Sequence, residues 1–449
     1  MSSNQVDRHL WLAYCKAVQN SVGGLPGHKP ALFFTKKAQK APVASPDIDP
    51  AYTNYGIDAI IDNLLQADDL FFDPSTKKTY VGGLLEYLQS VNLGGNCSPG
   101  LEMQIRMIGQ DFFRILAQLS QERERALASF EEQEEMGIID DLHFYEWSQM
   151  NAPGFINAQK KAEMMASRYQ ATVQQAGGPV AEQLVRDFRK IFQAQFSGVS
   201  VPGINMPACR ASANVTRGLL KANKLPHGVT YVPETTHMEY SSRIEHWIEG
   251  VGDGESSIQI NVADGKNVND SDFGHTVTEG HEFTPWISFS PQKGRSEHAL
   301  TLNNVDNEKK LDIQFSYDEI QSIPVHTGDW NVPSPGRLYK LKDSASQESR
   351  NLVNPCHLII VRNLGFKISF QDGAAARQID KHFEEAKAGG GIVRVFGIPA
   401  APDGNIEEST EESAHVARWD PCGNVLSIKP TIDAGFASVV AIVGEPDVN

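Results

Sequence analysis

Histidines and carboxylates in the C-terminal half are the residues whose types and spacing point most directly to chemistry. Ten of the 13 histidines lie at or after residue 227. If residues 237–239 are extended, His237 and Glu239 point to one face, because side chains alternate along a strand. His246 follows nine residues after His237. We therefore take His237, Glu239 and His246 as candidate catalytic residues, acting as acid, base or metal ligand.

Imidazoles and a carboxylate on a β-scaffold form the kind of site that binds iron, copper or zinc. The sequence thus predicts a divalent metal ion as a candidate cofactor. Six residues are candidate ligands: His237, Glu239, His246, His275, His281 and His326. The alternative interpretation is that histidines scattered through an acidic region are surface residues or hydrogen-bonded structural groups.

Tryptophans offer a second route to a site. Four of the six follow residue 227, and Trp247, Trp286 and Trp330 are candidates for lining a small-molecule pocket. A buried indole needs a partner for its N–H group, so tryptophans often line sites. Aromatic side chains dominate hydrophobic cores even more often, and the core interpretation is favoured for each of the three.

Other signatures of chemistry are absent from the sequence or have a simpler meaning. The chain has no phosphate-binding loop, dinucleotide fingerprint, serine-nucleophile elbow or HExxH motif. The glycines at 389–391 follow a predicted helix and precede a strand, an order that indicates a helix end rather than a phosphate cradle. The aspartate pairs at 68–69 and 140–141 lack the spacing of a diphosphate site and are taken as caps. Cys356 is taken as structural, because its neighbour His357 would face the opposite way on a strand.

The first half of the chain has the period of helices. Ser98 and Pro99 are a typical helix start, and a helix is predicted from there to about residue 135. Its apolar residues step by three or four positions. Further helices are predicted near residues 55–66, 79–92, 151–175 and 179–196. Residues 51–200 are therefore expected to form a bundle-like helical domain. Residues 1–50 are expected to be a short helix followed by an extended surface arm.

Beyond a linker at 201–228, the period changes to that of strands. Apolar residues alternate with polar ones through runs such as 258–262 and 311–317, with turn residues between them. About ten short strands and one helix at about 376–388 indicate an antiparallel sandwich or barrel over residues 229–449. The expected fold class is α+β, with a helical domain followed by this β-rich domain.

Charge excludes some partners. The formal charge of −16 is concentrated after residue 226, where 33 acids face 18 bases. Such a surface is unsuited to nucleic acid or an anionic membrane. The N-terminus lacks a secretory signal pattern, no run is apolar enough to cross a membrane, and five scattered cysteines suit reduced thiols. We expect a cytoplasmic protein without a transmembrane segment.

Two C-terminal segments carry a resemblance. Residues 388–399, AGGGIVRVFGIP, and residues 430–445, PTIDAGFASVVAIVGE, resemble stretches of uncharacterised proteins from filamentous fungi. The resemblance covers the C-terminal half and implies no activity, cofactor or site residue.

Three functions fit these observations. The first is an enzyme acting on a small molecule, metal-assisted or acid–base, in specialised metabolism, with its site in the β-rich domain or at the seam with the helices. The second is a pore-forming or membrane-active protein, since residues 275–317 alternate as an inserting hairpin would. The third is a non-enzymatic binding or structural assembly protein that uses the charged helix at 120–135 as an interaction surface.

Overall fold

The computed structural model describes residues 3–23, 30–42, 44, 50–76, 78–94, 97–139, 144–197, 232–248, 254–260, 265–275, 283–291, 298–299, 311–403, 415–430 and 437–446. Within these ranges the protein contains both helices and sheets, which confirms the α+β class. The linker predicted at 201–228 lies outside the described residues. No helix in the described ranges is long and apolar enough to cross a membrane.

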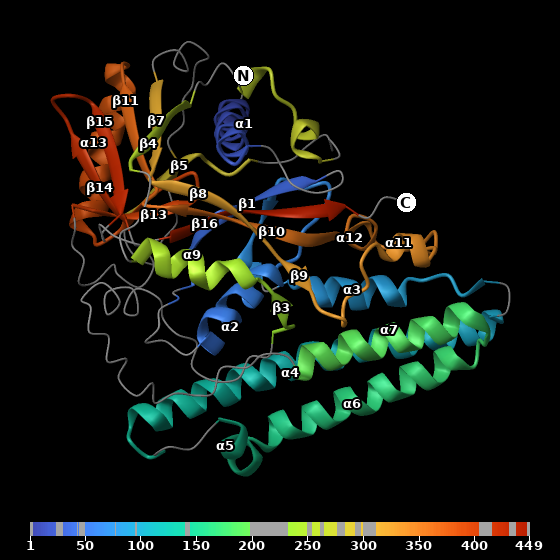
Figure 1. The fold of residues 1–449 in the computed structure, drawn as a ribbon. Coiled ribbons are helices and arrows are strands. Elements are labelled where there is room, and N and C mark those ends of the chain that lie inside the picture. The colour runs from blue at the N-terminus through green and yellow to red at the C-terminus, as the bar shows by residue number, and fades with distance from the viewer. Residues whose placement is uncertain are drawn as a thin grey trace.

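A five-stranded sheet lies at the centre of the molecule (Figure 1). Its strands, in spatial order, are β2 (Phe71–Phe72), β1 (Ala31–Lys40), β16 (Ala437–Pro446), β10 (Val353–Arg362) and β8 (Glu319–Pro324). The central strand β16 pairs antiparallel with both β1 and β10. Residues 437–444 are all buried, because this strand is covered on both faces.

The position of β1 corrects the expectation of a surface arm in residues 1–50. Leu32, Phe33 and Phe34 are almost completely buried. Leu32 and Phe34 face one hydrophobic core and Phe33 faces another, as alternation along a strand requires. The N-terminal segment is therefore part of the β-rich body, and both ends of the chain contribute strands to the same sheet.

A second sheet has nine strands. In spatial order they are β4 (Ser256–Ile260), β7 (Leu311–Tyr317), β11 (Gly365–Phe370), β15 (Val425–Pro430), β14 (His415–Asp420), β13 (Ile398–Pro402), β12 (Ile392–Val395), β5 (Ile287–Ser290) and β6 (His298–Ala299). All neighbours are antiparallel except β13 and β14. Helix α13 (Gly373–Ala388) packs on this sheet and confirms the predicted helix at 376–388. Asp372 caps its start and Gly389 its end.

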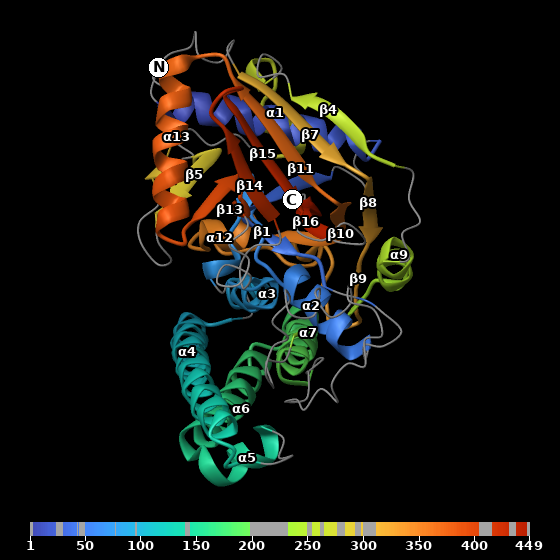
Figure 2. The same cartoon turned by 90° about the vertical axis from the view of Figure 1, so that its left-hand side faces the viewer.

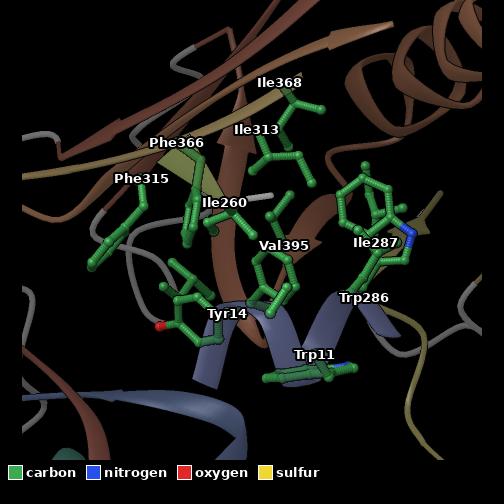
Figure 3. Packing of buried hydrophobic residues seen from close by; sticks show 14 of the residues in the cluster. Trp11, Tyr14, Ile260, Trp286, Ile287, Ile313, Phe315, Phe366, Ile368 and Val395 are labelled. Atoms are coloured by element: carbon green, nitrogen blue, oxygen red, sulfur yellow. The ribbon is translucent and has the colours of Figure 1, made fainter. Parts of the chain in front are cut away.

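Helix α1 (Ser3–Ser21) lies between the two sheets and is buried on nearly all sides. The ring of Tyr14 lies 5.6 Å from that of Phe34 on β1 and 5.8 Å from that of Phe315 on β7. Figure 3 shows Tyr14 beside Phe366 of the nine-stranded sheet. Residues 10–15 of α1 are all buried, and this stretch lies inside the largest hydrophobic cluster among the described residues.

Two helices cover the other face of the five-stranded sheet. They are α2 (Pro50–Ile61) and α9 (Met238–Ile248), which share a core with that face. Two short strands, β3 (Thr235–Thr236) and β9 (His326–Thr327), pair beside them. The helix α9 corrects the strand expected at residues 237–239. Tyr240, Ile244 and Trp247 recur at helical spacing and are buried, so this segment has the period of a helix.

The remaining helices form the long layer at the bottom of Figure 1. They are α3 (Tyr80–Gln89), α4 (Pro99–Glu135), α5 (Phe144–Asn151), α6 (Pro153–Gln174) and α7 (Gly178–Ser197), and the bounds of α4, α6 and α7 confirm the sequence prediction. We call residues 99–174 the helical arm. Figure 2 shows the arm extending away from the sheets, with α5 at its far end. Short helices at Pro74–Thr76, Asp270–Phe273, Pro335–Leu338 (α11) and Gln347–Arg350 (α12) complete the described elements.

Candidate functional site

A buried carboxyl and a buried imidazole meet between α2 and the start of α9. Asp58 Oδ1 accepts hydrogen bonds from the backbone N–H of Thr235, at 3.1 Å, and from the Thr235 hydroxyl. His237 Nε2 lies 3.7 Å from the same oxygen, and the two side chains are 1% and 7% exposed. Asp58 Oδ2 and His237 Nε2 are both buried without a hydrogen-bond partner. We call Asp58 and His237 the buried pair.

Burial sets the protonation of the buried pair. It raises the pKa of Asp58 from 3.8 to about 7, opposed by the hydrogen bonds from Thr235 and reinforced by the charge of Glu234. Asp62, one helical turn along α2, also has its pKa raised to about 7 by burial, with a hydrogen bond from Val81 N opposing the shift. Burial lowers the pKa of His237 below 6.5. At neutral pH the pair is therefore a neutral imidazole beside a carboxyl whose pKa is raised into the neutral range.

Strand β3 holds the pair in place because it is fixed from both sides. The Trp330 indole donates to the carbonyl oxygen of Glu234 at 2.7 Å, and the next N–H, that of Thr235, donates to Asp58. These two groups belong to one peptide unit and point in opposite directions, because the peptide is trans and planar. Trp330 and Asp58 thus clamp the same peptide from opposite sides.

A polar network continues from β3 into the helical layer. β9, the partner of β3, carries Thr327, whose Oγ accepts from Asn331 Nδ2 at 2.7 Å. Asn331 Nδ2 also donates to Asn354 Oδ1 at 2.8 Å. The hydroxyl of Tyr80, at the start of α3, lies 3.0 Å from Asn331 Oδ1 and 3.1 Å from Asn354 Oδ1. The buried pair therefore lies next to the seam between the sheets and the helices.

The structure brings His237 to this site but not the other predicted ligands. Glu239 and His246 are exposed on α9, and the nine residues from His237 to His246 span about 13 Å of helix. His326 is exposed on β9, opposite Thr236. His275 is buried elsewhere, with its Nε2 2.7 Å from the carbonyl oxygen of Leu32. His281 lies outside the described residues. Within the ranges that the structure describes, no group of three or more His, Cys, Asp or Glu residues is arranged to hold a metal ion.

The three candidate pocket tryptophans have different surroundings. Trp247 and Trp286 are at most 1% exposed and lie in hydrophobic clusters. The Trp247 indole donates to Glu319 Oε2 at 2.7 Å. Trp330 is half-buried at the seam, its ring 6.3 Å from that of Tyr80. Only Trp330 therefore lies near the buried pair.

The thiol of Cys356 is not prepared for nucleophilic chemistry. It donates to the carbonyl oxygen of Val443 at 3.3 Å, and burial raises its pKa to about 12. A thiol with that pKa carries almost no thiolate at neutral pH. These contacts agree with the structural role that the sequence indicates for Cys356.

Asp58 and Asp62 were not among the sequence candidates, although a signal for them exists. Both lie in the predicted helix at 55–66, next to the buried apolar residues Ile57, Ile60 and Ile61. An acid on an apolar helix face is unusual because burying a charge is costly. The contrast with its apolar neighbours identifies Asp58 as unusual from the sequence alone. Its contact with His237, 179 residues away, depends on the tertiary fold.

Comparison with known proteins adds no relative. No protein-family model, no curated protein and no solved structure matches this chain. The resemblance of residues 388–399 and 430–445 to fungal proteins therefore stays a prediction, and any function must be argued from the site itself.

Proposed function

We propose that the protein is an enzyme that transfers a proton to or from a small molecule, with Asp58 and His237 as its acid–base pair. The observation that carries this proposal is the pair of adjacent buried atoms, Asp58 Oδ2 and His237 Nε2, that have no hydrogen-bond partner. Buried polar atoms in folded proteins almost always have partners, so two such atoms together favour a third group that joins them.

The protonation of the pair supports this role. A general acid or base works best when its pKa is near the operating pH. The pKa of Asp58 is raised to about 7, and burial keeps His237 neutral. Asp58 can therefore take up or release a proton at neutral pH, and the Nε2 of a neutral His237 can accept one or donate one, depending on its tautomer.

The proposal uses no metal ion. Asp58 and His237 supply one carboxylate and one imidazole, whereas catalytic zinc sites have three protein ligands. The hydrogen bonds from Thr235 and the Trp330 clamp instead fix the carboxylate direction, which is the positioning that proton transfer requires.

Proton transfer to carbon leaves a label that requires no knowledge of the substrate. The purified protein is incubated with a small-molecule cell extract in D2O, and mass spectrometry records compounds that gain deuterium or change mass. We expect at least one such compound with the wild-type protein and its loss with Asp58→Asn and with His237→Gln. His246→Gln, at the exposed histidine of α9, is the matched control and keeps the signal.

Two results would overturn the proposal. One is an extract that the wild-type protein leaves unchanged relative to a no-protein control. The other is an activity that survives in both Asp58→Asn and His237→Gln. Circular dichroism of each variant separates loss of chemistry from loss of folding.

A further inference from the structure

Exposed apolar side chains are concentrated on the helical layer. Of the large apolar residues that the structure describes as exposed, only Met238 and Leu338 lie elsewhere. The others are Met103, Met107, Met136, Ile138, Met150, Met164 and Val180. Single exposed apolar residues are ordinary, so an interaction surface requires several of them to lie close together.

The far end of the arm carries three of this group, including the two most exposed. Met136 and Ile138 follow the last turn of α4, and Met150 lies on α5; they are 62%, 66% and 69% exposed. We call these three residues the tip patch. Methionine is unbranched and polarisable, so it adapts to differently shaped apolar partners. Figure 2 places α5 at the end of the arm away from the sheets, where a partner can approach.

A firm core lies beneath the tip patch. Phe130 packs on Phe144 with ring centroids 5.6 Å apart and on Trp147 at 5.4 Å. The Trp147 indole donates to Gln133 Oε1 at 2.9 Å. These contacts join the end of α4 to α5, so the segments that carry Met136 and Met150 are held by one hydrophobic cluster.

Charge identifies the kind of partner. Residues 122–146 contain nine acids and two bases in the sequence. Glu132 and Glu146 are exposed near the tip patch in sequence. Each lies four positions before a methionine of the tip patch, Met136 or Met150, which is the spacing of neighbours on a helix. An apolar surface flanked by such acids is complementary to a helix that is apolar on one face and basic on the other. The same acids disfavour an anionic lipid surface.

We propose that the tip patch docks a basic amphipathic helix of a partner protein. This inference is independent of the buried pair, which lies beside the sheets. The apolar face of the partner helix would cover Met136, Ile138 and Met150, and its lysines or arginines would face Glu132 and Glu146.

The test uses a synthetic peptide of leucine and lysine whose leucines recur every three to four positions. Its fluorescently labelled form is titrated with the full-length protein, and binding is followed by anisotropy. Peptides with glutamate in place of lysine, and with the leucines scrambled, are the comparison probes. We expect saturable binding of the basic amphipathic peptide alone, weakened by added salt.

Variants locate the binding surface. The triple variant Met136→Gln, Ile138→Gln and Met150→Gln is expected to weaken binding by about tenfold or more. Met238→Gln, at a methionine 87% exposed outside the arm, is the matched control and leaves binding unchanged. Gln replaces exposed side chains in both, so neither variant is expected to unfold the protein.

Several results would overturn the inference. They are equal binding of the acidic and basic peptides, equal weakening by Met238→Gln and by the triple variant, and no binding at all. Two others would assign the tip patch to a different occupant. One is dimerisation that the triple variant abolishes, seen by light scattering. The other is binding to neutral phosphatidylcholine vesicles that the triple variant abolishes.

Discussion

Asp58 illustrates how one buried group can join folding to chemistry. Its Oδ1 accepts two hydrogen bonds from Thr235, which offset part of the cost of burial, while its Oδ2 accepts none. An ionised carboxylate in this position is costly, so the fold favours the protonated form. The stability of the protein should therefore depend on the pH, with Asp58 as one contributor beside Asp62.

The pH dependence has a definite sign. An acid whose pKa rises from 3.8 to about 7 on folding binds more protons in the folded state between these values. Protonated Asp58 therefore contributes stability to the folded state that is lost as the pH rises through this window. Asp58→Asn removes the ionisation and should stabilise the protein more at pH 8 than at pH 5, by roughly 2–3 kcal/mol. Urea unfolding of both proteins at both pH values measures this difference.

Comparing the wild-type protein with Asp58→Asn cancels the contribution of His237, the other titrating group in the buried pair. Burial lowers the pKa of His237, so that residue costs stability as the pH falls below 6.5, but it is present in both proteins. Asp329→Asn, at an exposed carboxyl, is the matched control and should have the same effect at pH 5 and pH 8. A gain from Asp58→Asn that does not change with pH would contradict the burial of an ionisable Asp58.

Sequence could predict part of this site. His237 stands out because histidine titrates near neutral pH, but the sequence predicts its partners among neighbouring histidines and Glu239. Glu239 and His246 lie on the same segment, yet the helix α9 turns them to solvent. The actual partner, Asp58, comes from the helical domain that the sequence predicts at residues 51–200. No local pattern encodes a contact across 179 residues.

At the scale of elements, helix α1 is the central packing element of the body. Both sheets pack on it, and the chain after β4 passes close to its backbone. At Gly265 an added Cβ would overlap the carbonyl oxygen of His9, where neither backbone can easily move. Only glycine fits such a close approach.

Gly265→Ala should therefore destabilise the protein by about 3 kcal/mol, because the overlap forces α1 out of place. Gly100→Ala is the control, since it lies in the first turn of α4 with open space around its Cβ position. That change should be neutral or stabilise by up to about 1 kcal/mol. Thermal unfolding of both variants is the measurement, and a Gly265→Ala protein as stable as Gly100→Ala would contradict the packing of α1.

A second contact between elements joins the helices to the sheets. The hydroxyl of Tyr339, which follows α11, donates to Asp187 Oδ2 on α7 at 2.5 Å. Asp187 is buried, and its other oxygen accepts from Gln183 at 2.9 Å. Tyr339→Phe leaves that buried carboxyl oxygen without its partner, which costs about 1.5–3 kcal/mol.

We expect faster hydrogen exchange along α7 in Tyr339→Phe, together with this loss in urea unfolding. Tyr87→Phe is the matched control, because the Tyr87 hydroxyl donates to a neutral acceptor, the carbonyl oxygen of Tyr339, at 3.2 Å. Its cost should be smaller, near 1 kcal/mol. An equal or larger effect of Tyr87→Phe would show that Asp187 does not anchor α7 through Tyr339.

The elements differ in how well the sequence predicts them. Helices α4, α6 and α7 have proline at or near their starts and a long apolar stripe, and these local signals suffice. The sequence does not predict strand β1, because its apolar run, Ala31–Phe34, is followed by lysines and preceded by a proline-rich stretch. Burial on both faces, which explains that run, depends on strands 400 residues away.

At the scale of the whole molecule, the chain forms one body with a projecting arm. The strands β1 and β16 pair in the same sheet, so the chain returns to its starting sheet after forming the arm. The sequence predicts a helical domain followed by a β-rich domain. That order does not include a strand near the N-terminus that pairs with the last strand. The first half of the chain is nearly neutral as a whole, yet residues 122–146 within it carry nine acids and two bases.

The far end of the arm has its own core. There, Leu119, Phe130, Phe144, Trp147 and Phe155 form one cluster. The near half of the arm belongs instead to the cluster of α3 and α7, and the two clusters meet at the partly buried Ile115 and Leu116. Elements that share few apolar contacts with the rest of a protein open independently of it. The far end of the arm should therefore unfold locally without loss of the body.

Trp147→Ala tests this independence, because it empties the centre of the distal cluster, where Trp147 is 2% exposed. The local cost is about 3–5 kcal/mol, and we expect hydrogen-exchange protection to fall in residues 119–139 and 144–162. Protection of α1 and β16 should not change. Trp286→Ala, at the equally buried tryptophan beside α1, is the control and should reduce protection throughout the body, because both sheets share its core. If Trp147→Ala also lowered protection in α1 and β16, the arm and the body would form a single cooperative unit.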